Sequence, residues 1–442
     1  MRVETVPASA RPSRASRPMI LAVSASCLGW AFDLFDLFIL LYIAPILAKV
    51  FFPSTQPMLS LAGVYAAFTA TLLMRPVGGA LFGPYADRSG RKRVLVISAI
   101  GVGVATAFMG ALPTVEQIGI AAPLAFVGLR LVQGLFMGGM VASTHTIGTE
   151  SMLPQWRGLA SGIISGGGSG LGKLFASLVF LMASWLFPGP AFAVWGWRFM
   201  FFSGLLSAGL GLLVFSKLEE SPLWLQAQAP RPAAATTRRQ GPLRTILRGR
   251  FLPIVAVCVM LTLAGGGLSY LTSGYLPTVL RLVNHIKPTT LGLILSLSAV
   301  CVIASSVLGG LITDLIGRRK AIAIYGVLAL VAIPLLYLQL GKTQDVFGVG
   351  ILAVLLSGIG TFCYAPLLII LNERFPTAVR SSGTAVSWNV GFSLGGSLPV
   401  LVSLLSHSPD DLPYTLAIVT AVVSLIYLWG VWFTPATLEP MQ

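Results

Sequence analysis

The stretch GPYADRSGRKR at residues 83–93 returns as GLITDLIGRRK at residues 310–320. Each copy closes one long apolar segment and opens the next. The acids that the two copies share, Asp87 and Asp314, lie about half the chain apart. We infer that the chain is a duplication in which each half contains several apolar segments.

A second pattern, an acid followed by an arginine, is also repeated about half the chain apart. Glu150 is followed seven residues later by Arg157, and Glu373 is followed seven residues later by Arg380. Two similar membrane halves are a common way to build a transporter whose site lies between them.

The composition requires lipid as the main solvent. The chain has 442 residues, of which 55% are hydrophobic and only 10% are charged, whereas soluble domains carry about 25% charged residues. Twelve apolar stretches, from residues 20–48 to residues 413–434, have the length of about 20 residues that crosses a bilayer. The sequence therefore predicts an all-α membrane protein with twelve transmembrane helices in two six-helix halves.

The same pattern divides the chain into five parts. We expect an N-terminal tail, a first half, a polar linker, a second half and a C-terminal tail, at residues 1–18, 19–216, 217–250, 251–434 and 435–442.

Basic residues indicate the orientation. Most of the 29 lysines and arginines lie in the N-terminal tail and in the even-numbered connections between apolar stretches. The odd-numbered connections contain only Lys49, Arg198, Arg281, Lys287 and Lys342. The positive-inside rule then places both termini in the cytoplasm.

We therefore attribute the net charge of +15 to basic residues that orient the chain in the membrane. No connection interleaves basic and aromatic residues as a nucleic-acid surface would, so we expect no nucleic-acid partner.

The four cysteines lie in apolar segments and are interpreted as packing residues, with no metal site. No nucleophile–base set is visible, which argues against an enzyme.

The loop G-x-x-x-D-R-x-G-R-K-R resembles the signature loop of the major facilitator superfamily. FDLFDLF at residues 32–38 is similar to the D-x-x-D motif of the metabolite, sialate and aromatic-acid proton symporters within it. The strings RPVGGALFG, RLVQG, PQWRG and EESPLW are similar to that branch as well, and the resemblance covers the chain from residue 20 onward.

The resemblance implies a transporter in the inner membrane that imports a small organic anion with protons by alternating access. The substrate would be a mono-, di- or aromatic carboxylate, and the sequence does not separate these. The proton would be the coupling ion with no other cofactor, and we expect a monomer to be functional.

Ionisable groups in mid-membrane cost roughly 2.5–3.5 kcal/mol each on insertion scales, so they need partners or a function. Five such residues lie deep in apolar segments of the first half: Asp33, Asp36, Arg75, Arg130 and Lys173. The second half has no comparable charge at depth. We therefore expect the first half to carry the coupling.

Asp33 and Asp36 are three residues apart and should share a helix face. Two carboxylates so close cannot both ionise cheaply in a low dielectric, so one is expected to bind a proton readily. Our hypothesis is that Asp36, rather than Asp33, titrates and that Arg130 is its counter-ion. The alternative is a static ion pair that joins two helices.

Other residues are candidates for proton transfer. Gln133, with Gly134, completes a motif that the resemblance associates with proton transfer. His145, whose side chain titrates near neutral pH, is expected either to relay protons or to be an ordinary hydrogen-bonding residue.

Lys173 follows the small-residue string SGGGSGLG, which leaves room for a ligand beside the ammonium. It would bind a substrate carboxylate, or else snorkel or pair with an acid of the first helix. Arg75 is a second candidate, because a guanidinium grips a carboxylate with two donors; its alternative role is a lock on the cytoplasmic side. The further expected substrate contacts are Arg130, Gln133, Tyr270, Tyr364 and Asn389.

The repeated loops are expected to form a gate that holds the cytoplasmic side closed. The alternative is that these charges only set the orientation of the chain in the membrane. The gating candidates are Asp87, Arg88, Arg91, Glu150, Arg157, Asp314, Arg318, Glu373 and Arg380.

Two rival functions remain open from the sequence. One is a proton-driven exporter of drugs or metabolites, and the other is a membrane sensor that does not transport. Three buried cations favour an anionic substrate, because an anion in a low dielectric needs neutralisation.

Overall fold

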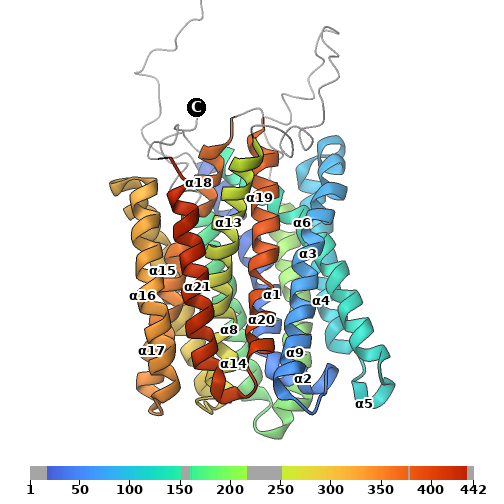
Figure 1. Ribbon diagram of the computed structural model, residues 1–442. Helices are drawn as coiled ribbons and strands as arrows, with labels where there is room; N and C mark the ends of the chain where they lie inside the picture. Colours follow the sequence, from blue (N-terminus) through green and yellow to red (C-terminus); the bar gives the residue numbers. More distant parts are fainter. Residues whose placement is uncertain (1–16, 151–159, 161, 217–250, 377–378, 436–442) are drawn as a thin grey trace, which may run out of the picture.

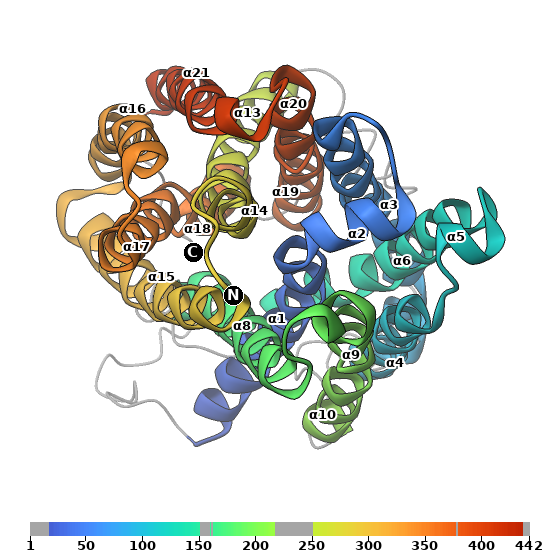
Figure 2. The ribbon, with the colours of Figure 1, turned by 90° about the horizontal axis from the view of Figure 1, so that it is seen from below.

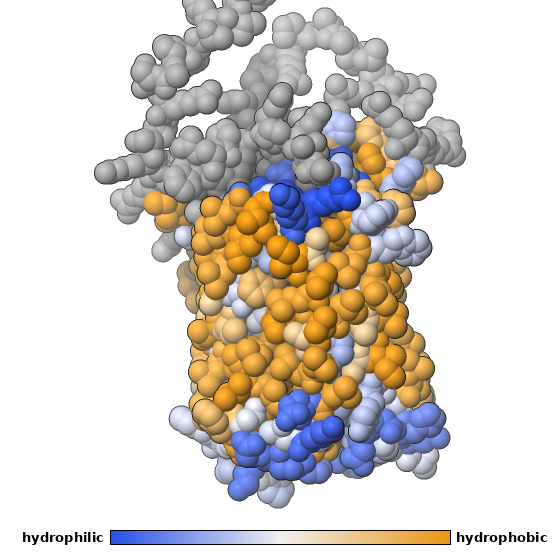
Figure 3. Space-filling model, turned by 60° about the vertical axis from the view of Figure 1, so that its left-hand side comes forward, coloured by the Kyte–Doolittle hydropathy of each residue, from blue (hydrophilic) through white to orange (hydrophobic). Residues whose placement is uncertain are grey.

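The computed structural model describes residues 17–150, 160, 162–216, 251–376 and 379–435. Twelve helical spans in these ranges are long and apolar enough to cross a membrane, which confirms the predicted all-helical membrane fold. A broad apolar band crosses the face of the molecule seen in Figure 3, with hydrophilic residues gathered above and below it.

The first half contains six spans and two short helices outside them. Its elements are α1 (Arg17–Tyr42), α2 (Ala44–Phe51), α3 (Pro57–Ser89), α4 (Arg91–Ala111), α5 (Val115–Ile118), α6 (Ala121–Glu150), η3 (Ile163–Gly167), α8 (Gly168–Leu186), η4 (Phe192–Gly196), α9 (Trp197–Phe202) and α10 (Gly204–Ser216).

The second half repeats the pattern with more breaks within its spans. Its elements are α13 (Leu252–Ser269), η6 (Tyr270–Gly274), α14 (Leu276–Leu282), α15 (Pro288–Ile316), α16 (Arg318–Lys342), α17 (Val346–Tyr364), α18 (Leu367–Arg374), α19 (Arg380–Gly395), α20 (Leu398–Leu405), η7 (Pro409–Asp411) and α21 (Leu412–Trp432).

The repeated loop has the same backbone turn in both halves. Gly90 links α3 to α4 with φ 94°, and Gly317 links α15 to α16 with φ 89°. Glycine is favoured there because it has no Cβ to clash at positive φ. The duplicated sequence therefore produces a duplicated turn.

The two halves lie side by side and meet along the centre of the molecule (Figure 2). The helix α8 packs against α15, and α3 packs against α19 and α20. Both halves begin at the upper end in Figure 1, which we call the termini end. The opposite end, where α2 and α14 lie, is called the distal end (Figure 1).

Glycines set the distance between α3 and α6. A Cβ on Gly134 would clash with the backbone oxygen of Thr71, and a Cβ on Gly138 would clash with that of Arg75. These helices therefore touch backbone to backbone, as small residues allow in membranes. The contact fixes the position of Arg75 on α3 relative to α6.

Replacing Gly138 by leucine should remove most of the folded protein. Overpacking typically costs about 1–3 kcal/mol, and a clash with backbone cannot be relieved by a rotamer change. Gly128→Leu is the matched control, because a Cβ at Gly128 on the same helix meets no atom within 4 Å. Size-exclusion chromatography and thermal unfolding in detergent would compare the two. Equal yields and melting temperatures for both variants would contradict this account of the α3–α6 contact.

Candidate functional site

The helix α1 buries both acids of the FDLFDLF string, each about 1% exposed. Asp33 faces α3, where Arg75 Nη2 donates to both carboxylate oxygens at 2.9 and 3.0 Å. The same nitrogen lies 3.4 Å from Met137 Sδ of α6. Arg75 is thus paired with an acid of the first helix.

Asp36 faces other neighbours. Ser207 Oγ of α10 donates to Asp36 Oδ2 at 3.2 Å, and Thr106 of α4 lies beside the same carboxyl group. Among the described residues, Asp36 Oδ1 has no hydrogen-bond partner. A buried carboxyl oxygen without a donor is costly unless it carries a proton or gains a partner.

Arg130 is fully buried and contacts a glutamine rather than a carboxylate. Arg130 Nη1 donates to Gln133 Oε1 at 2.7 Å, and Gln133 Nε2 donates to Thr106 Oγ1 at 2.7 Å. The guanidinium lies over the rings of Phe126 and Phe201, 5.5 and 5.7 Å from their centroids. Its Nε and Nη2 have no hydrogen-bond partner in the described part of the chain.

The expected direct pair of Asp36 with Arg130 is therefore not formed here. Arg130 instead bonds Gln133, which bonds Thr106, and the first-helix acid that forms a salt bridge is Asp33. Arg130 still interacts electrostatically with Asp36.

Lys173 is 2% exposed and reaches from the first half to the second. Its Nζ donates to Ser273 Oγ at 3.2 Å and to Ser269 Oγ at 3.4 Å, and it lies 5.1 Å from the ring centroid of Phe38. No carboxylate lies within 4 Å of this ammonium among the described residues. The alternative in which Lys173 pairs with an acid of α1 is therefore not seen.

Small residues bring Lys173 to the boundary between the halves. A Cβ on Gly172 would clash with Ala31 of α1, and a Cβ on Gly170 would clash with Ile303 of α15. The helix α8 therefore packs closely against α1 of its own half and against α15 of the other half.

Sequence analysis did not identify Ser269 and Ser273. They lie at the junction of α13 with the π-helical segment η6, and π-helical turns often occur at functional sites. The only signal was the pair of serines four residues apart within GGGLSYLTSG.

An aromatic cluster spans the interface between the halves. Trp30 Nε1 of α1 donates to Tyr364 OH at 3.3 Å, and Tyr364 OH lies 3.5 Å from Ser165 O. Trp388 stacks on Phe392 with centroids 4.3 Å apart and meets Trp30 edge-on at 5.8 Å. The cluster contains one expected contact residue, Tyr364.

Two other expected contacts have different surroundings. Tyr270 is buried between Phe68 and Phe392, with ring centroids 5.2 and 6.1 Å away. Asn389 is only partly buried, and its Nδ2 donates to Ala385 O on its own helix. Asn389 therefore lies on a face of α19 that is only partly covered, and its role as a substrate contact stays a prediction.

A polar aromatic contact joins the halves toward the distal end. Tyr65 OH of α3 lies 2.7 Å from Thr278 Oγ1 of α14, and the rings of Tyr65 and Tyr275 stack at 4.8 Å. Tyr275 OH in turn lies 2.8 Å from Ser403 Oγ of α20. We call Tyr65, Tyr275, Thr278 and Ser403 the distal contact.

Tyr65→Phe should favour opening of the distal end by about fivefold, since a neutral buried hydrogen bond is worth about 1 kcal/mol. Tyr325→Phe is the control, because Tyr325 OH donates to Gly309 O within one half. Distances between labels at the exposed positions Glu116 and Gln344, one in each half, would report the opening. An unchanged distance distribution in Tyr65→Phe would contradict a gating role for the distal contact.

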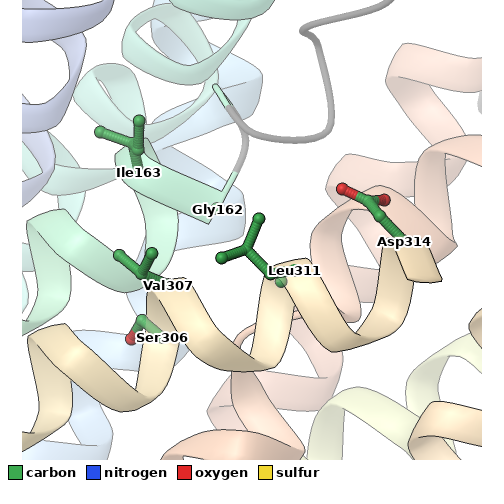
Figure 4. Close-up of a pocket in the computed structure, with 7 residues that line it drawn as sticks. Gly162, Ile163, Ser306, Val307, Leu311 and Asp314 are labelled. Atoms are coloured by element: carbon green, nitrogen blue, oxygen red, sulfur yellow. The ribbon is translucent and has the colours of Figure 1, made fainter. Parts of the chain in front are cut away.

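The described contacts among the gating candidates lie within the second half. Arg318 contacts Asp314 on the preceding turn, and Arg318 Nε lies 3.3 Å from Glu373 Oε2 of α18. A small pocket lies where η3 meets α15, with Asp314 at one end (Figure 4). The other gating candidates and His145 have side chains outside the described residues: Asp87, Arg88, Arg91, Glu150, Arg157 and Arg380.

Comparison with known proteins agrees with this architecture. Residues 57–246 match the family model of sugar (and other) transporters, and residues 266–441 match that of the major facilitator superfamily. The chain is 32% identical to the inner membrane metabolite transport protein YhjE of Escherichia coli, over 85% of this chain and 84% of that protein.

Two further similarities are informative. The proline/betaine transporter of Escherichia coli is 28% identical, over 92% of this chain and 82% of that one. A crystal structure of a D-xylose-proton symporter superposes with a TM-score of 0.72 at 18% identity, covering 94% of this chain and 98% of that one. The protein is thus a membrane transporter, not an enzyme, and the chain belongs to the major facilitator superfamily.

Proposed function

We propose that the protein takes up a small carboxylate together with protons, by alternating access across the inner membrane, with both termini in the cytoplasm. The observation that carries this proposal is Lys173. It is a buried ammonium at the boundary between the halves, and its described polar partners are two hydroxyls.

A substrate carboxylate would complete this arrangement. An ammonium in a low dielectric is stabilised far more by an anion than by neutral hydroxyls. Arg75 is already paired with an acid, Asp33, and the described contacts of Arg130 all lie within the first half, whereas Lys173 lies at the boundary between the halves. Lys173 is therefore the preferred anchor, with Arg75 and Arg130 as secondary candidates.

Asp36 is the proposed proton site. Its Oδ1 has no described donor, and Arg130 has two N–H groups without a described acceptor. In our proposal Asp36 is protonated in the arrangement seen here and loses its proton in another state of the cycle. Arg130 then turns from Gln133 toward the ionised carboxylate, which shifts the equilibrium between states.

The repeated loops are proposed to gate the cytoplasmic side. The contacts of Arg318 with Asp314 and Glu373 would hold the second-half loop, and the first-half acids and arginines would act in the matching way. Charge-assisted contacts of this kind stabilise one of two alternative arrangements.

A zwitterion is a second candidate substrate. Its carboxylate would bind the Lys173 ammonium in the same way as that of a simple anion, because the charge-assisted contact is the same for both classes. Relatives named as proline/betaine transporters favour including this class.

Proteoliposomes under an imposed inward proton gradient would test the proposal. We expect at least one labelled mono-, di-, aromatic or zwitterionic carboxylate to accumulate, and a protonophore to abolish the accumulation. Proton-driven movement of cationic or neutral drugs with no carboxylate uptake would indicate an exporter instead. No transport of any compound, with substrate binding retained, would indicate a sensor.

A further inference from the structure

The contact between Lys173 and the two serines joins the two halves of the molecule directly. Lys173 belongs to α8 of the first half, whereas Ser269 ends α13 and Ser273 lies in η6 of the second half. The distances of 3.4 and 3.2 Å leave no room for another group between the ammonium and either hydroxyl.

The serines are held firmly by the second half. Tyr337 OH donates to Leu271 O at 2.8 Å, and Ser357 Oγ lies 3.4 Å from Thr272 O, so groups of α16 and α17 bond the backbone of η6. The hydroxyls therefore follow the second half when it moves. Lys173 reaches them only when the halves are close together.

A symporter must pass through a closed arrangement twice in each cycle, once loaded and once unloaded. On the loaded passage a substrate carboxylate neutralises Lys173, a step that rests on the proposed function. On the unloaded passage the same ammonium would be buried without an anion, which is strongly unfavourable.

We infer that Ser269 and Ser273 are the partners of Lys173 during the return of the unloaded carrier. Each hydroxyl accepts a hydrogen bond from the ammonium while the halves are closed. When substrate arrives, its carboxylate takes over the ammonium. The two serines are thus positioning residues that set the rate of return rather than the chemistry of substrate binding.

The double variant Ser269→Ala/Ser273→Ala separates the two passages. Exchange of labelled for unlabelled substrate needs only the loaded carrier and should stay within about twofold of the unmodified protein. Net uptake needs the unloaded return and should slow by about tenfold or more for each hydrogen bond lost, because bonds to charged groups are worth at least one tenfold step. Ser273→Thr on the Ser269→Ala background should restore part of the net uptake.

A matched control lies at the same boundary. Ser296 Oγ of α15 lies 3.0 Å from Ser177 Oγ of α8, so it is also a hydroxyl contact between the halves, but it contains no charge. Ser296→Ala should leave the ratio of exchange to net uptake unchanged. Equal loss of both activities in the serine double variant, or loss of neither, would overturn the inference.

A second measurement requires no substrate. Spin labels at Glu116→Cys and Gln344→Cys, in a background without native cysteines, report the separation of the halves at the distal end. Without substrate, the serine double variant should populate the open distances several times more than Ser296→Ala does. If the protein carries no carboxylate at all, the proposed function fails, and this distance measurement still decides whether the Lys173–serine contact holds the halves together. An unchanged distribution would refute that contact's role.

Discussion

Lys173→Met should reduce carboxylate uptake by about a hundredfold or more, because leaving a buried charge without its partner costs about 3–5 kcal/mol. Methionine keeps much of the length and apolar stem of lysine, so the packing beside Phe38 should survive. Substrate affinity should fall together with the uptake rate, since the lost interaction is made to the bound substrate. Binding by calorimetry and initial uptake rates in proteoliposomes would measure both.

The control for this variant is Lys49→Met, since Lys49 is exposed on α2 at the distal end. It should transport normally. Lys173→Arg should keep part of the activity, because the charge remains while the larger guanidinium fits the space between the serines poorly. Carboxylate uptake that persisted in Lys173→Met, with unchanged affinity, would contradict the carboxylate assignment and leave Lys173 as a structural charge.

The fold could be predicted from the sequence because lipid imposes simple rules. A span must be apolar and about 20 residues long, so twelve apolar stretches correspond to twelve helical spans. The repeated loop was equally readable, because Gly90 and Gly317 each require a backbone turn that glycine favours.

The pairing of charges could not be predicted in the same way. Sequence places a residue at a depth along its helix, but it does not say which neighbouring helix the residue faces. Asp33 and Asp36 are one helical turn apart, yet one meets Arg75 of α3 and the other meets Ser207 of α10. The position of Arg75 itself is set by glycine contacts between α3 and α6, which join residues about sixty positions apart in the chain.

The serine partners of Lys173 were hidden for a related reason. Serine is common in membrane helices, and a hydroxyl becomes informative only when a charge lies within hydrogen-bond distance. Ser269 and Ser273 gain that significance from Lys173, nearly one hundred residues earlier in the chain. Contacts between helices far apart in sequence carry no local signature.

Asp36→Asn should abolish proton-driven accumulation while leaving substrate exchange largely intact. Asparagine has nearly the same shape as a protonated aspartate, and its amide oxygen would still accept the hydrogen bond from Ser207. The variant would behave as a carrier that is permanently protonated at this site. With one proton per substrate, a gradient of about two pH units could drive about hundredfold accumulation in the unmodified protein, whereas the variant should reach only the external concentration.

Asp33→Asn is the informative comparison, because it removes a charge at the same depth in the same helix. It would leave the Arg75 guanidinium buried without its anion, so it should reduce exchange and net uptake together, along with thermal stability. Steady-state accumulation and exchange, measured on both variants in the same proteoliposomes, distinguish a proton site from a structural pair. If Asp36→Asn still accumulated substrate in a protonophore-sensitive way, while Asp33→Asn kept exchange but lost accumulation, Asp33 would be the proton site. The Arg75 ion pair, rather than the Arg130–Gln133 pair, would then be the element that changes partners during the cycle.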